Sequence, residues 1–300
     1  MTKKRVRRKM DFSIPINLGP YILLFSFFIA IPVVLALMLS FSNFDVINAP
    51  RFIGLTNYVR ILTNDEVFMR HVLPNTLLFS MVVGPIGFGL QFLLAWALAQ
   101  LPKVPRLILA LCFYSPSITL GITMAVIWRV VFGGDQFGYI NYLLLRFDLI
   151  ERPIQFLQDP RFTMPIMIIV SLWVSMGVGF LAMLAGILNV DQELYEAAYV
   201  DGLNNRFQEA IYITIPSMKP QMLFGAVMAI VATFSTGQIG ADLTGANPTP
   251  MYAGQTMLLH IEDHAMLRYE MGYASALAVV LLLMILGAST IANKLFLQKD

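Results

Sequence analysis

One constellation in the sequence has residue types and spacing suited to metal chemistry, the run His260-Ile261-Glu262-Asp263-His264. A helix would place both histidines on one face, with acidic side chains nearby to complete a zinc site. The order differs from the HExxH pattern of zinc proteases, and the run falls between two apolar stretches. We therefore expect a polar loop that faces solvent or contacts a partner protein, without a bound metal.

Other catalytic chemistry has few residues to support it. The single cysteine, Cys112, lies in an apolar stretch with no His or Asp to activate it, and alone it forms no disulfide. No GxxxxGK run followed by Ser or Thr occurs, so the chain cannot hydrolyse ATP through a P-loop. The net charge of +2 gives no reason to expect a nucleic acid. We expect a non-enzymatic chain that binds no cofactor of its own.

The composition points to a membrane. Hydrophobic residues make up 58% of the 300 residues and charged residues 13%, whereas soluble domains have roughly 45–50% and about 25%. The excess apolar surface must face lipid, and spanning segments in lipid must be helical to pair their own backbone groups. The predicted fold class is therefore an all-α membrane protein.

Six uncharged runs reach the length of about 20 residues that crosses a bilayer. Pro32, Pro85, Pro116 and Pro165 interrupt four of them, and we expect the strongest distortion at 114–117, where hydroxyl groups can take up freed backbone groups. The predicted spans are 20–40, 76–98, 107–128, 163–187, 222–240 and 271–292.

The distribution of Lys and Arg predicts the orientation. With six spans both termini lie on one side, which holds twelve of the twenty Lys and Arg residues, against eight on the other side. The acidic residues divide seven and eleven, so the two sides carry net charges of +5 and −3. Both termini are predicted to be cytoplasmic. Residues 1–19 then form a basic tail before a single membrane domain, residues 20–300.

The cytoplasmic loop between the fourth and fifth spans, residues 188–221, carries the most informative pattern. Leu194, Ala197, Ala198 and Asp201 share helical spacing. Gly202 suits the left-handed stop of such a helix. We expect the two small alanines to let another surface approach closely.

A second short helix is predicted in the same loop. Asn204 or Asn205 can cap its start, and Pro216 ends it. Arg206 and Glu209 fit two interpretations equally, a contact with a partner or a salt bridge within the helix.

Three groups of residues resemble a known family. Glu196-Ala197-Ala198, then Asp201-Gly202, then Ile213-Thr214-Ile215-Pro216 resemble the EAA motif of permease subunits in type I ABC importers. Ten residues separate Gly202 from Ile213, where that family usually has nine, which predicts that the second helix starts one residue late. Segments 52–58, 140–143 and 271–276 resemble carbohydrate-type permeases.

The resemblance implies the assembly and its location. In that family the loop forms coupling helices that sit in a cleft of an ATPase. The resemblance implies a heterodimer with a second similar permease, two ATPase subunits that bind ATP and Mg²⁺, and an extracytoplasmic solute-binding protein, all at the bacterial cytoplasmic (inner) membrane. This multi-pass chain would form half of the pathway for a sugar or oligosaccharide. The residues expected to couple it to the ATPase are Glu196, Ala197, Ala198, Asp201, Gly202 and Arg206.

Contacts with the solute are expected from aromatic faces and from nearby amides and hydroxyls. Polar groups within a membrane usually face the interior of a helix bundle, although hydrogen bonds between helices explain many of them equally well. The candidates are Trp128, Asn141, Trp173, Ser175, Thr236 and Gln238.

Three other functions would explain the hydrophobicity of the chain but not its other features. A secondary transporter working without an ATPase is the main alternative, and such proteins often have repeated halves and intramembrane ionisable groups. The predicted spans carry no charge and the chain shows no convincing repeat. An intramembrane enzyme would need a catalytic cluster at membrane depth, and a channel would need filter-like rings.

Overall fold

The computed structural model describes residues 13–119 and 121–297. Its elements are helices, apart from one antiparallel pair of short strands, β1 (Ser42–Asn43) and β2 (Arg51–Phe52). The predicted all-α class is therefore confirmed. The six Lys and Arg residues at the start of the predicted basic tail lie outside the described residues.

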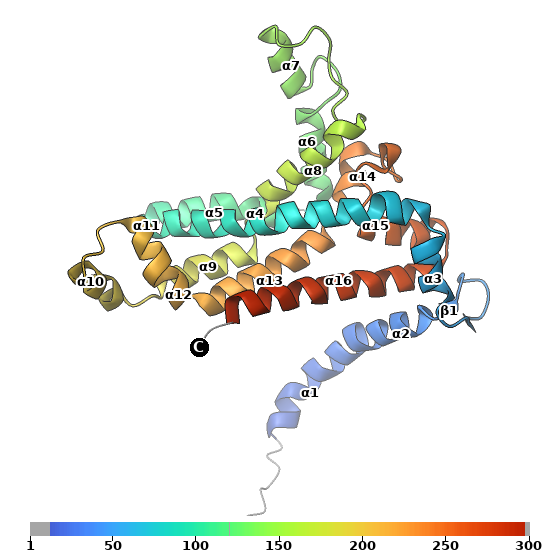
Figure 1. Cartoon of the computed structure of the whole chain (residues 1–300), viewed down its shortest axis with the longest axis horizontal. Coiled ribbons are helices and arrows are strands. Elements are labelled where there is room, and N and C mark those ends of the chain that lie inside the picture. The colour runs from blue at the N-terminus through green and yellow to red at the C-terminus, as the bar shows by residue number, and fades with distance from the viewer. Residues whose placement is uncertain (1–12, 120, 298–300) are drawn as a thin grey trace, which may run out of the picture.

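Four helices form a central bundle: α4 (Leu73–Ala99), α9 (Val178–Leu188), α13 (Lys219–Ser235) and α16 (Met271–Leu297) (Figure 1). Helix α13 packs against α4, α9 and α16, and α4 also packs against α9. The bundle therefore joins segments that lie far apart in the sequence.

Two glycines allow close approach of α9 and α13. A Cβ atom on Gly179 would lie 3.4 Å from the Cα of Gly225, and one on Gly225 would lie 2.5 Å from the Cε of Met183. Small residues at such a seam favour helix association in lipid, because van der Waals packing between helices replaces the missing hydrophobic driving force there.

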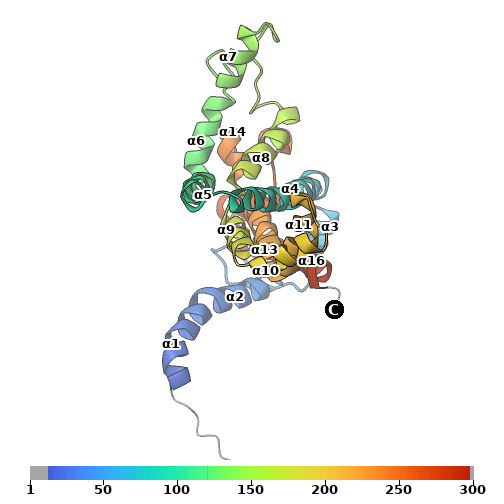
Figure 2. The ribbon, with the colours of Figure 1, turned by 90° about the vertical axis from the view of Figure 1, so that its left-hand side faces the viewer.

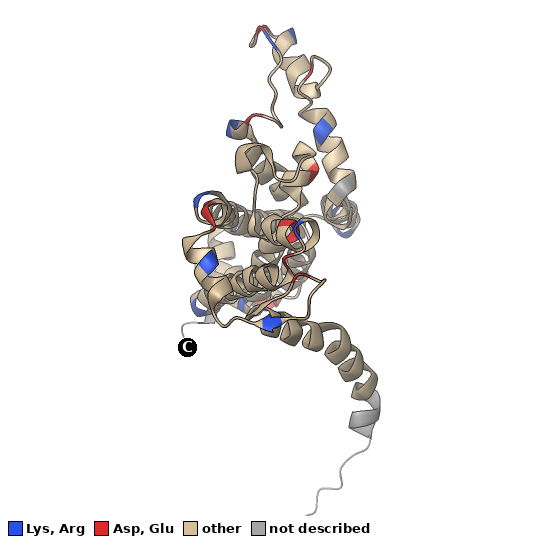
Figure 3. Cartoon of the chain, turned by 90° about the vertical axis from the view of Figure 1, so that its right-hand side faces the viewer, with Lys and Arg blue, Asp and Glu red and all other residues tan. Residues whose placement is uncertain are grey.

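The amino-terminal helices extend away from the bundle. They are α1 (Ser13–Phe25), the π-helical turn η1 (Ser26–Ala30) and α2 (Ile31–Leu39). No charged residue occurs along them (Figure 3), and α2 packs on α16. Most of their described side chains are exposed. Such a surface needs lipid or another apolar surface to cover it.

Three π-helical turns end two residues before a proline. They are η1 before Pro32, η2 (Phe68–Val72) before Pro74 and η3 (Ala210–Thr214) before Pro216. Proline lacks an N–H, and its ring displaces the carbonyl four residues earlier. We attribute the widened turns to this displacement.

The predicted third span, 107–128, is not one continuous helix. It divides into α5 (Lys103–Ile118) and α6 (Gly121–Val131), which meet at 98°. Before the break the Ser117 hydroxyl donates to the Tyr114 carbonyl at 2.7 Å, and the Ser115 hydroxyl donates to the Cys112 carbonyl at 3.0 Å. Hydroxyl groups thus bond to the backbone around Pro116, as the sequence predicts.

The fourth and fifth predicted spans also cross helix ends. Helix α8 (Pro160–Val174) and α9 are bent by 43° at residues 175–177. Pro165 lies within α8 without breaking it. Because α13 ends at Ser235, the predicted run 222–240 extends beyond its helix.

Three helical segments are long and apolar enough to cross a membrane by themselves, and six are if each bent pair counts as one span. The first three are Leu18–Leu39, Phe68–Ala99 and Met271–Leu295. Each predicted run therefore overlaps a helix, while several of the predicted boundaries differ from those of the helices.

An arm of α6, α7 (Tyr139–Arg146) and α8 projects from the bundle on the side opposite to α1 (Figure 2). The fully buried Asn141 holds its tip together. The Asn141 amide donates to the carbonyls of Gly133 and Ile154 at 2.8 and 2.9 Å, and it accepts from the Ile154 N–H at 2.9 Å.

The two ends of the bundle carry different loops (Figure 1). One end carries the elements of the 188–221 loop, which are α10 (Gln192–Val200), α11 (Arg206–Glu209), η3 and α12 (Ile215–Ser217). The other end carries α3 (Thr56–Thr63), η2, α14 (Ile239–Thr244), the 3₁₀ turn η4 (Pro250–Tyr252), α15 (Met257–Glu262) and the π-helical turn η5 (Asp263–Leu267).

Candidate functional site

The first helix of the 188–221 loop has defined start and stop residues. The Asp191 carboxylate accepts from the Glu193 N–H at 3.1 Å and caps α10. Gly202, with φ of +96°, follows the helix, and the Leu203 N–H then donates to the Ala198 carbonyl at 3.0 Å. Gly202 therefore makes the left-handed turn that its sequence position predicts.

The second helix starts where an asparagine can cap it. The Asn205 side chain accepts from the Phe207 N–H at 3.0 Å, and α11 begins at Arg206. The helical path continues through η3 and α12 to Ser217, one residue beyond Pro216. Of the two predicted caps, Asn205 is the one used.

A buried carboxylate joins the two helices. Only 5% of the surface of Glu209 is exposed. The Tyr199 hydroxyl of α10 donates to it, and the Arg206 guanidinium lies 3.3 Å away. Tyr195 and Thr214 add a hydroxyl–hydroxyl bond of 2.9 Å between the same two segments. Arg206 and Glu209 thus form the salt bridge that was one of the two sequence interpretations.

The outer surface of this pair of helices combines apolar and acidic side chains. Val200 is 89% exposed, and Leu194 and Phe207 are also exposed. The carboxylates of Glu193 and Glu196 lie on the exposed part of α10. Such an apolar surface with acidic neighbours is suited to contact with another protein.

The predicted coupling residues divide between this surface and the interior. Glu196, Ala197, Asp201, Gly202 and Arg206 are exposed. Ala198 is buried within the chain. The expectation that both alanines face another surface therefore needs a correction: the small side chain of Ala198 lets α10 sit close to its own chain instead.

A crevice of about 350 Å³ lies behind α10. Its lining includes Trp96 and Gln100 from the end of α4, Arg106 from α5, and Tyr195 and Glu196 from α10. The crevice lies between the exposed helix, the end of α4 and the start of α5.

A second candidate site lies where the broken helices meet. A pocket of about 320 Å³ is lined by Gln91 of α4, Ser117 of α5, Ser175 and Gly177 at the α8–α9 break, and Thr236 at the end of α13. Irregular backbone at membrane depth is tolerated where it lines a cavity or is buried in protein. The pocket therefore accounts for the position of these helix ends.

Most hydroxyls around this pocket already bond to their own helix. Ser175 donates to the Leu172 carbonyl at 2.7 Å and Thr233 to the Ala229 carbonyl at 2.7 Å. The buried Ser171 hydroxyl and the Gln91 side-chain oxygen have no partner among the described residues. These two atoms are polar groups without a hydrogen-bond partner beside the pocket, and the described lining of the pocket includes no charged side chain.

A neighbouring pocket of about 250 Å³ extends toward α14. It shares Ser171, Val174 and Thr236 with the first pocket and adds Gln238 and Asp242. Burial raises the pKa of the Asp242 carboxyl; nearby Arg129 opposes the shift. The two pockets together outline a path from the helix breaks toward the end that carries α14.

The predicted solute contacts are only partly gathered here. Ser175 lines the pocket of about 320 Å³ at the helix breaks, and Thr236 lines that pocket and the neighbouring one of about 250 Å³. Gln238 lines the neighbouring pocket, where its amide donates to Glu262 at 2.9 Å. Trp128 and Trp173 contact each other edge to face, with ring centroids 5.0 Å apart. Asn141 lies apart from all of them, at the tip of the arm.

Most lining residues of this pocket were not among the predicted contacts, and the polar ones among them include Gln91, Ser117 and Ser171. Gln91 had a usable signal, because an amide near the centre of an apolar span usually faces the bundle interior. The two serines had none, since hydroxyls within membrane helices commonly bond to their own backbone.

The two histidines do not lie in the polar, exposed loop that the sequence predicts. His260 and His264 are both buried, so the predicted solvent-facing loop is wrong at these positions. The ring Nε2 of His260 lies 2.9 Å from Asp65, and the Nδ1 of His264 lies 2.8 Å from Glu270. The apolar packing of α15 and η5 against α16 encloses both rings.

Neighbouring groups set the charge of this cluster. Burial raises the pKa of the Asp65 carboxyl, but hydrogen bonds from His260, Tyr273 and the Phe68 N–H outweigh it and hold that pKa well below its ordinary value. Burial lowers the pKa of His264, which favours a neutral ring.

Residues 91–296 match the family model described as "Binding-protein-dependent transport system inner membrane component". The matched region begins within α4 and ends within α16. It includes the whole 188–221 loop and the helix breaks around the two pockets.

Curated relatives match along most of their length. The chain is 33% identical to the probable ABC transporter permease protein YesP of Bacillus subtilis, covering 95% of this chain and 90% of the relative. It is 29% identical to the arabinooligosaccharides transport system permease protein AraP of the same organism, covering 92% and 86%.

A solved structure has the same fold. It contains a bacterial alginate ABC transporter in complex with an alginate pentasaccharide-bound periplasmic protein. One of its chains superimposes with a TM-score of 0.76 at 23% identity, covering 94% of this chain and 93% of that chain.

Proposed function

The chain belongs to the family of binding-protein-dependent transport system inner membrane components, and we propose that it forms half of the translocation pathway of an ATP-driven importer for a sugar or oligosaccharide. It is a multi-pass permease subunit of the ABC transporter class in the bacterial inner membrane. In the proposed assembly a separate ATPase binds ATP and Mg²⁺, and this chain couples ATP hydrolysis to transport.

The exposed pair of helices α10 and α11 carries the proposal. Leu194, Val200 and Phe207 leave apolar surface in water unless a partner covers it. The residues of the proposed contact are Glu196, Ala197, Asp201, Gly202 and Arg206, with Ala198 supporting α10 from behind. Closure of the ATPase would push α10 toward the crevice beside α4 and α5, and so move the bundle.

A second permease subunit is proposed to complete the pathway. The pockets in this chain are open crevices of about 320 and 250 Å³, too small for an oligosaccharide to pass through alone. The uncharged, exposed α1–α2 segment offers apolar surface that a homologous subunit can cover. A solute-binding protein is proposed to dock at the opposite end, near α3 and α15. The alginate transporter complex supports this arrangement by its shared fold.

The pocket lining supports a carbohydrate as solute. Sugars present many hydroxyl groups, and Gln91, Ser171 and Thr236 offer neutral hydrogen-bonding partners. Trp128 and Trp173 provide aromatic rings on the neighbouring α6 and α8. The arabinooligosaccharide permease relative is consistent with this class of solute.

The proposed topology has six spans with both termini in the cytoplasm. Each bent pair of helices then contributes one span, and in the pair Arg206–Ser217 and Lys219–Ser235 the first part stays in the cytoplasmic loop. The distribution of Lys and Arg supports the orientation. The carboxyl-terminal end of α16 lies at the same end of the bundle as the 188–221 loop (Figure 1), as this topology requires.

Photo-crosslinking from the loop tests the proposal. A photoreactive amino acid replaces Val200, and the control replaces Ile47, which is equally exposed at 89% but lies at the opposite end. In native membranes we expect an adduct with a P-loop ATPase from position 200 and none from position 47. The absence of an ATPase adduct at position 200, together with solute uptake that needs no ATPase, would establish the secondary transporter instead.

A further inference from the structure

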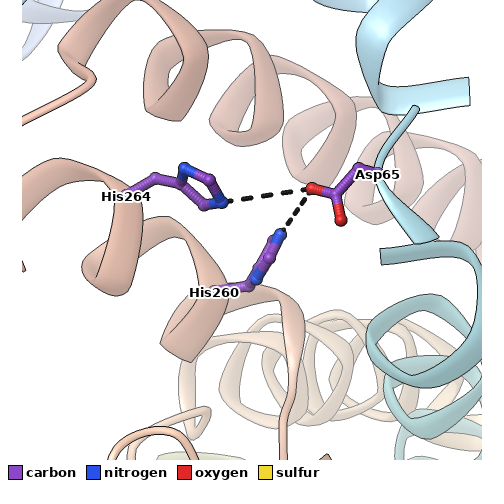
Figure 4. Close-up of side chains that lie close together, drawn as sticks. All are labelled: Asp65, His260 and His264. Atoms are coloured by element: carbon purple, nitrogen blue, oxygen red, sulfur yellow. Dashed lines mark hydrogen bonds and ion pairs between the residues drawn. The ribbon is translucent and has the colours of Figure 1, made fainter. Parts of the chain in front are cut away.

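Three potential metal ligands meet at the end of the bundle opposite the 188–221 loop (Figure 4). The Nε2 of His260 lies 2.9 Å from Asp65 Oδ2, and the Nε2 of His264 lies 4.0 Å from the same oxygen. All three ligand atoms lie within 4.8 Å of one another. They come from two segments far apart in the sequence, the turn between α3 and η2, and the continuous helical stretch of α15 and η5.

Hydrogen bonding orients the His264 ring so that its Nε2 can act as a ligand. Its Nδ1 lies 2.8 Å from the Glu270 carboxylate, which can only accept, so in a metal-bound ring Nδ1 would keep the proton. The lone pair of Nε2 then faces the carboxylate of Asp65 across 4.0 Å. Two electron-rich atoms facing each other in a buried site favour a cation between them.

We propose that Asp65, His260 and His264 bind a divalent transition-metal ion, Zn²⁺ by the chemistry of the donors. Two imidazoles and one carboxylate form a common ligand set for Zn²⁺. Ligand atoms about 2.0 Å from a tetrahedral ion lie roughly 3.3 Å apart, between the two distances of 2.9 and 4.0 Å found here. His260 would exchange its hydrogen bond to Asp65 for the ion, with its ring proton moving to Nδ1 and Nε2 becoming the ligand.

The surroundings supply the supports that such sites need. Glu270 accepts from Nδ1 of His264, the carboxylate–histidine arrangement that orients a metal-binding ring. The Tyr273 hydroxyl at 2.6 Å and the Phe68 N–H at 2.8 Å fix the Asp65 carboxylate. A pocket of about 250 Å³ opens onto the three ligands and leaves room for water in the fourth position.

The nearby cations do not oppose binding strongly, because each already has an acidic partner. Arg60 pairs with Glu270 at 3.0 Å, and Arg268 pairs with Asp263 at 2.8 Å. Asp65 is therefore the carboxylate left to balance part of the charge of the ion. The site is a structural one: it would tie the turn after α3 to α15 and η5, and it is independent of the proposed transport activity.

Metal binding is measured on the purified chain in mild detergent, without a polyhistidine tag and after treatment with a chelator. Equilibrium dialysis against Zn²⁺ and elemental analysis give the stoichiometry. Asp65→Asn and His264→Gln remove a ligand while nearly preserving shape. His71→Gln is the matched control, because it removes the remaining histidine of the chain, whose ring contacts Tyr252 and is none of the three proposed ligands.

We expect one Zn²⁺ per wild-type chain and per His71→Gln chain, with affinity at least about tenfold weaker in the other two variants. Co²⁺ bound to the wild-type chain should show the intense visible absorption of a tetrahedral site. The proposal is overturned if the wild-type chain binds only traces of Zn²⁺, or if all four proteins bind it equally. If the ligand variants fail to fold, a Co²⁺ spectrum of the wild-type chain without tetrahedral bands overturns it as well.

Discussion

Substitution of Gly202 tests the predicted coupling role of the 188–221 loop through a single physical cause, the strain of the backbone at this position. Its φ is +96°, in the left-handed region, and a Cβ placed on it would meet nothing within 4 Å. Gly202→Ala therefore introduces backbone strain without a steric clash. Gly202→Pro goes further, because proline fixes φ near −65° and removes the N–H that donates to the Tyr199 carbonyl at 3.2 Å.

The expected size follows from comparing strain with the bonds that oppose it. A non-glycine residue in the left-handed region costs about 1–2 kcal/mol. The bonds of Gly202 and Leu203 to α10 contribute about 1–3 kcal/mol together. Because the two terms are similar, Gly202→Ala should shift part of the population to loops without the turn. The apparent affinity for the ATPase then falls with the competent fraction, by up to about tenfold.

The assay measures association of the chain with its ATPase, and solute-stimulated ATP hydrolysis in reconstituted vesicles. We expect ATPase affinity and stimulated hydrolysis to decrease in the order wild type, Gly202→Asn, Gly202→Ala and Gly202→Pro. Asparagine precedes alanine because it tolerates the left-handed region better. Gly287→Ala in α16 is the control. Its Cβ also meets nothing within 4 Å, but its φ is not positive, so coupling should not change.

One result would refute this reasoning. If Gly202→Ala and Gly202→Pro insert normally, elute as single species and keep wild-type ATPase affinity and stimulation, the turn does not contribute to docking. The 188–221 loop would then not act as a coupling loop, despite its resemblance to one.

Three further substitutions probe other parts of the structure. Asn141→Ala removes three buried hydrogen bonds and should destabilise the arm by about 2–4 kcal/mol; an unchanged thermal unfolding temperature in detergent would contradict the role of Asn141. Gly225→Leu should disrupt packing of α13 on α9, by about 1–3 kcal/mol or more, and reduce the yield of monodisperse protein. Gly225→Ala is its control, because its Cβ would be in tight contact only with the flexible end of Met183, the Gly179 carbonyl lying 3.7 Å away; equal yields of the Leu and Ala variants would show that the seam is not tight. Ser171→Ala removes a buried hydroxyl that has no partner among the described residues, so stability should not fall, while solute uptake should require up to about tenfold more solute. Unchanged uptake would exclude Ser171 from the pathway.

Much of the helical framework could be predicted because lipid imposes simple rules. Uncharged runs of sufficient length mark spanning regions, and each predicted run overlaps an observed helix. The turn at Gly202 and the cap at Asn205 were also predictable, because both depend on local backbone chemistry.

The helix breaks could be located only in part. The proline and hydroxyl groups near 114–117 indicated a distortion, but hydrophobicity alone cannot give the 98° angle between α5 and α6. Likewise, Pro165 lies inside α8 while the bend occurs at 175–177. Packing of the segments against other helices decides which potential break is used.

Contacts that spacing does not show account for the other differences. The sequence indicated a solvent-facing histidine loop because Asp65, which accepts from His260, lies 195 residues earlier in the chain. Ala198 was expected to face a partner protein and Asn141 a solute, because spacing shows which residues share a face but not what covers that face. Both side chains are buried within this chain, and Asn141 bonds to Gly133 and Ile154.

Identification of the subunits that co-purify with this chain tests the central claim most directly. The chain is extracted from native membranes in a mild detergent, isolated under gentle conditions and analysed by mass spectrometry. We predict recovery of a second permease of the same family and of a P-loop ATPase. Replacing Gly202 by proline should abolish recovery of the ATPase and leave recovery of the second permease unchanged. Recovery of the wild-type chain alone, stable, monodisperse and active in solute uptake, would contradict the account.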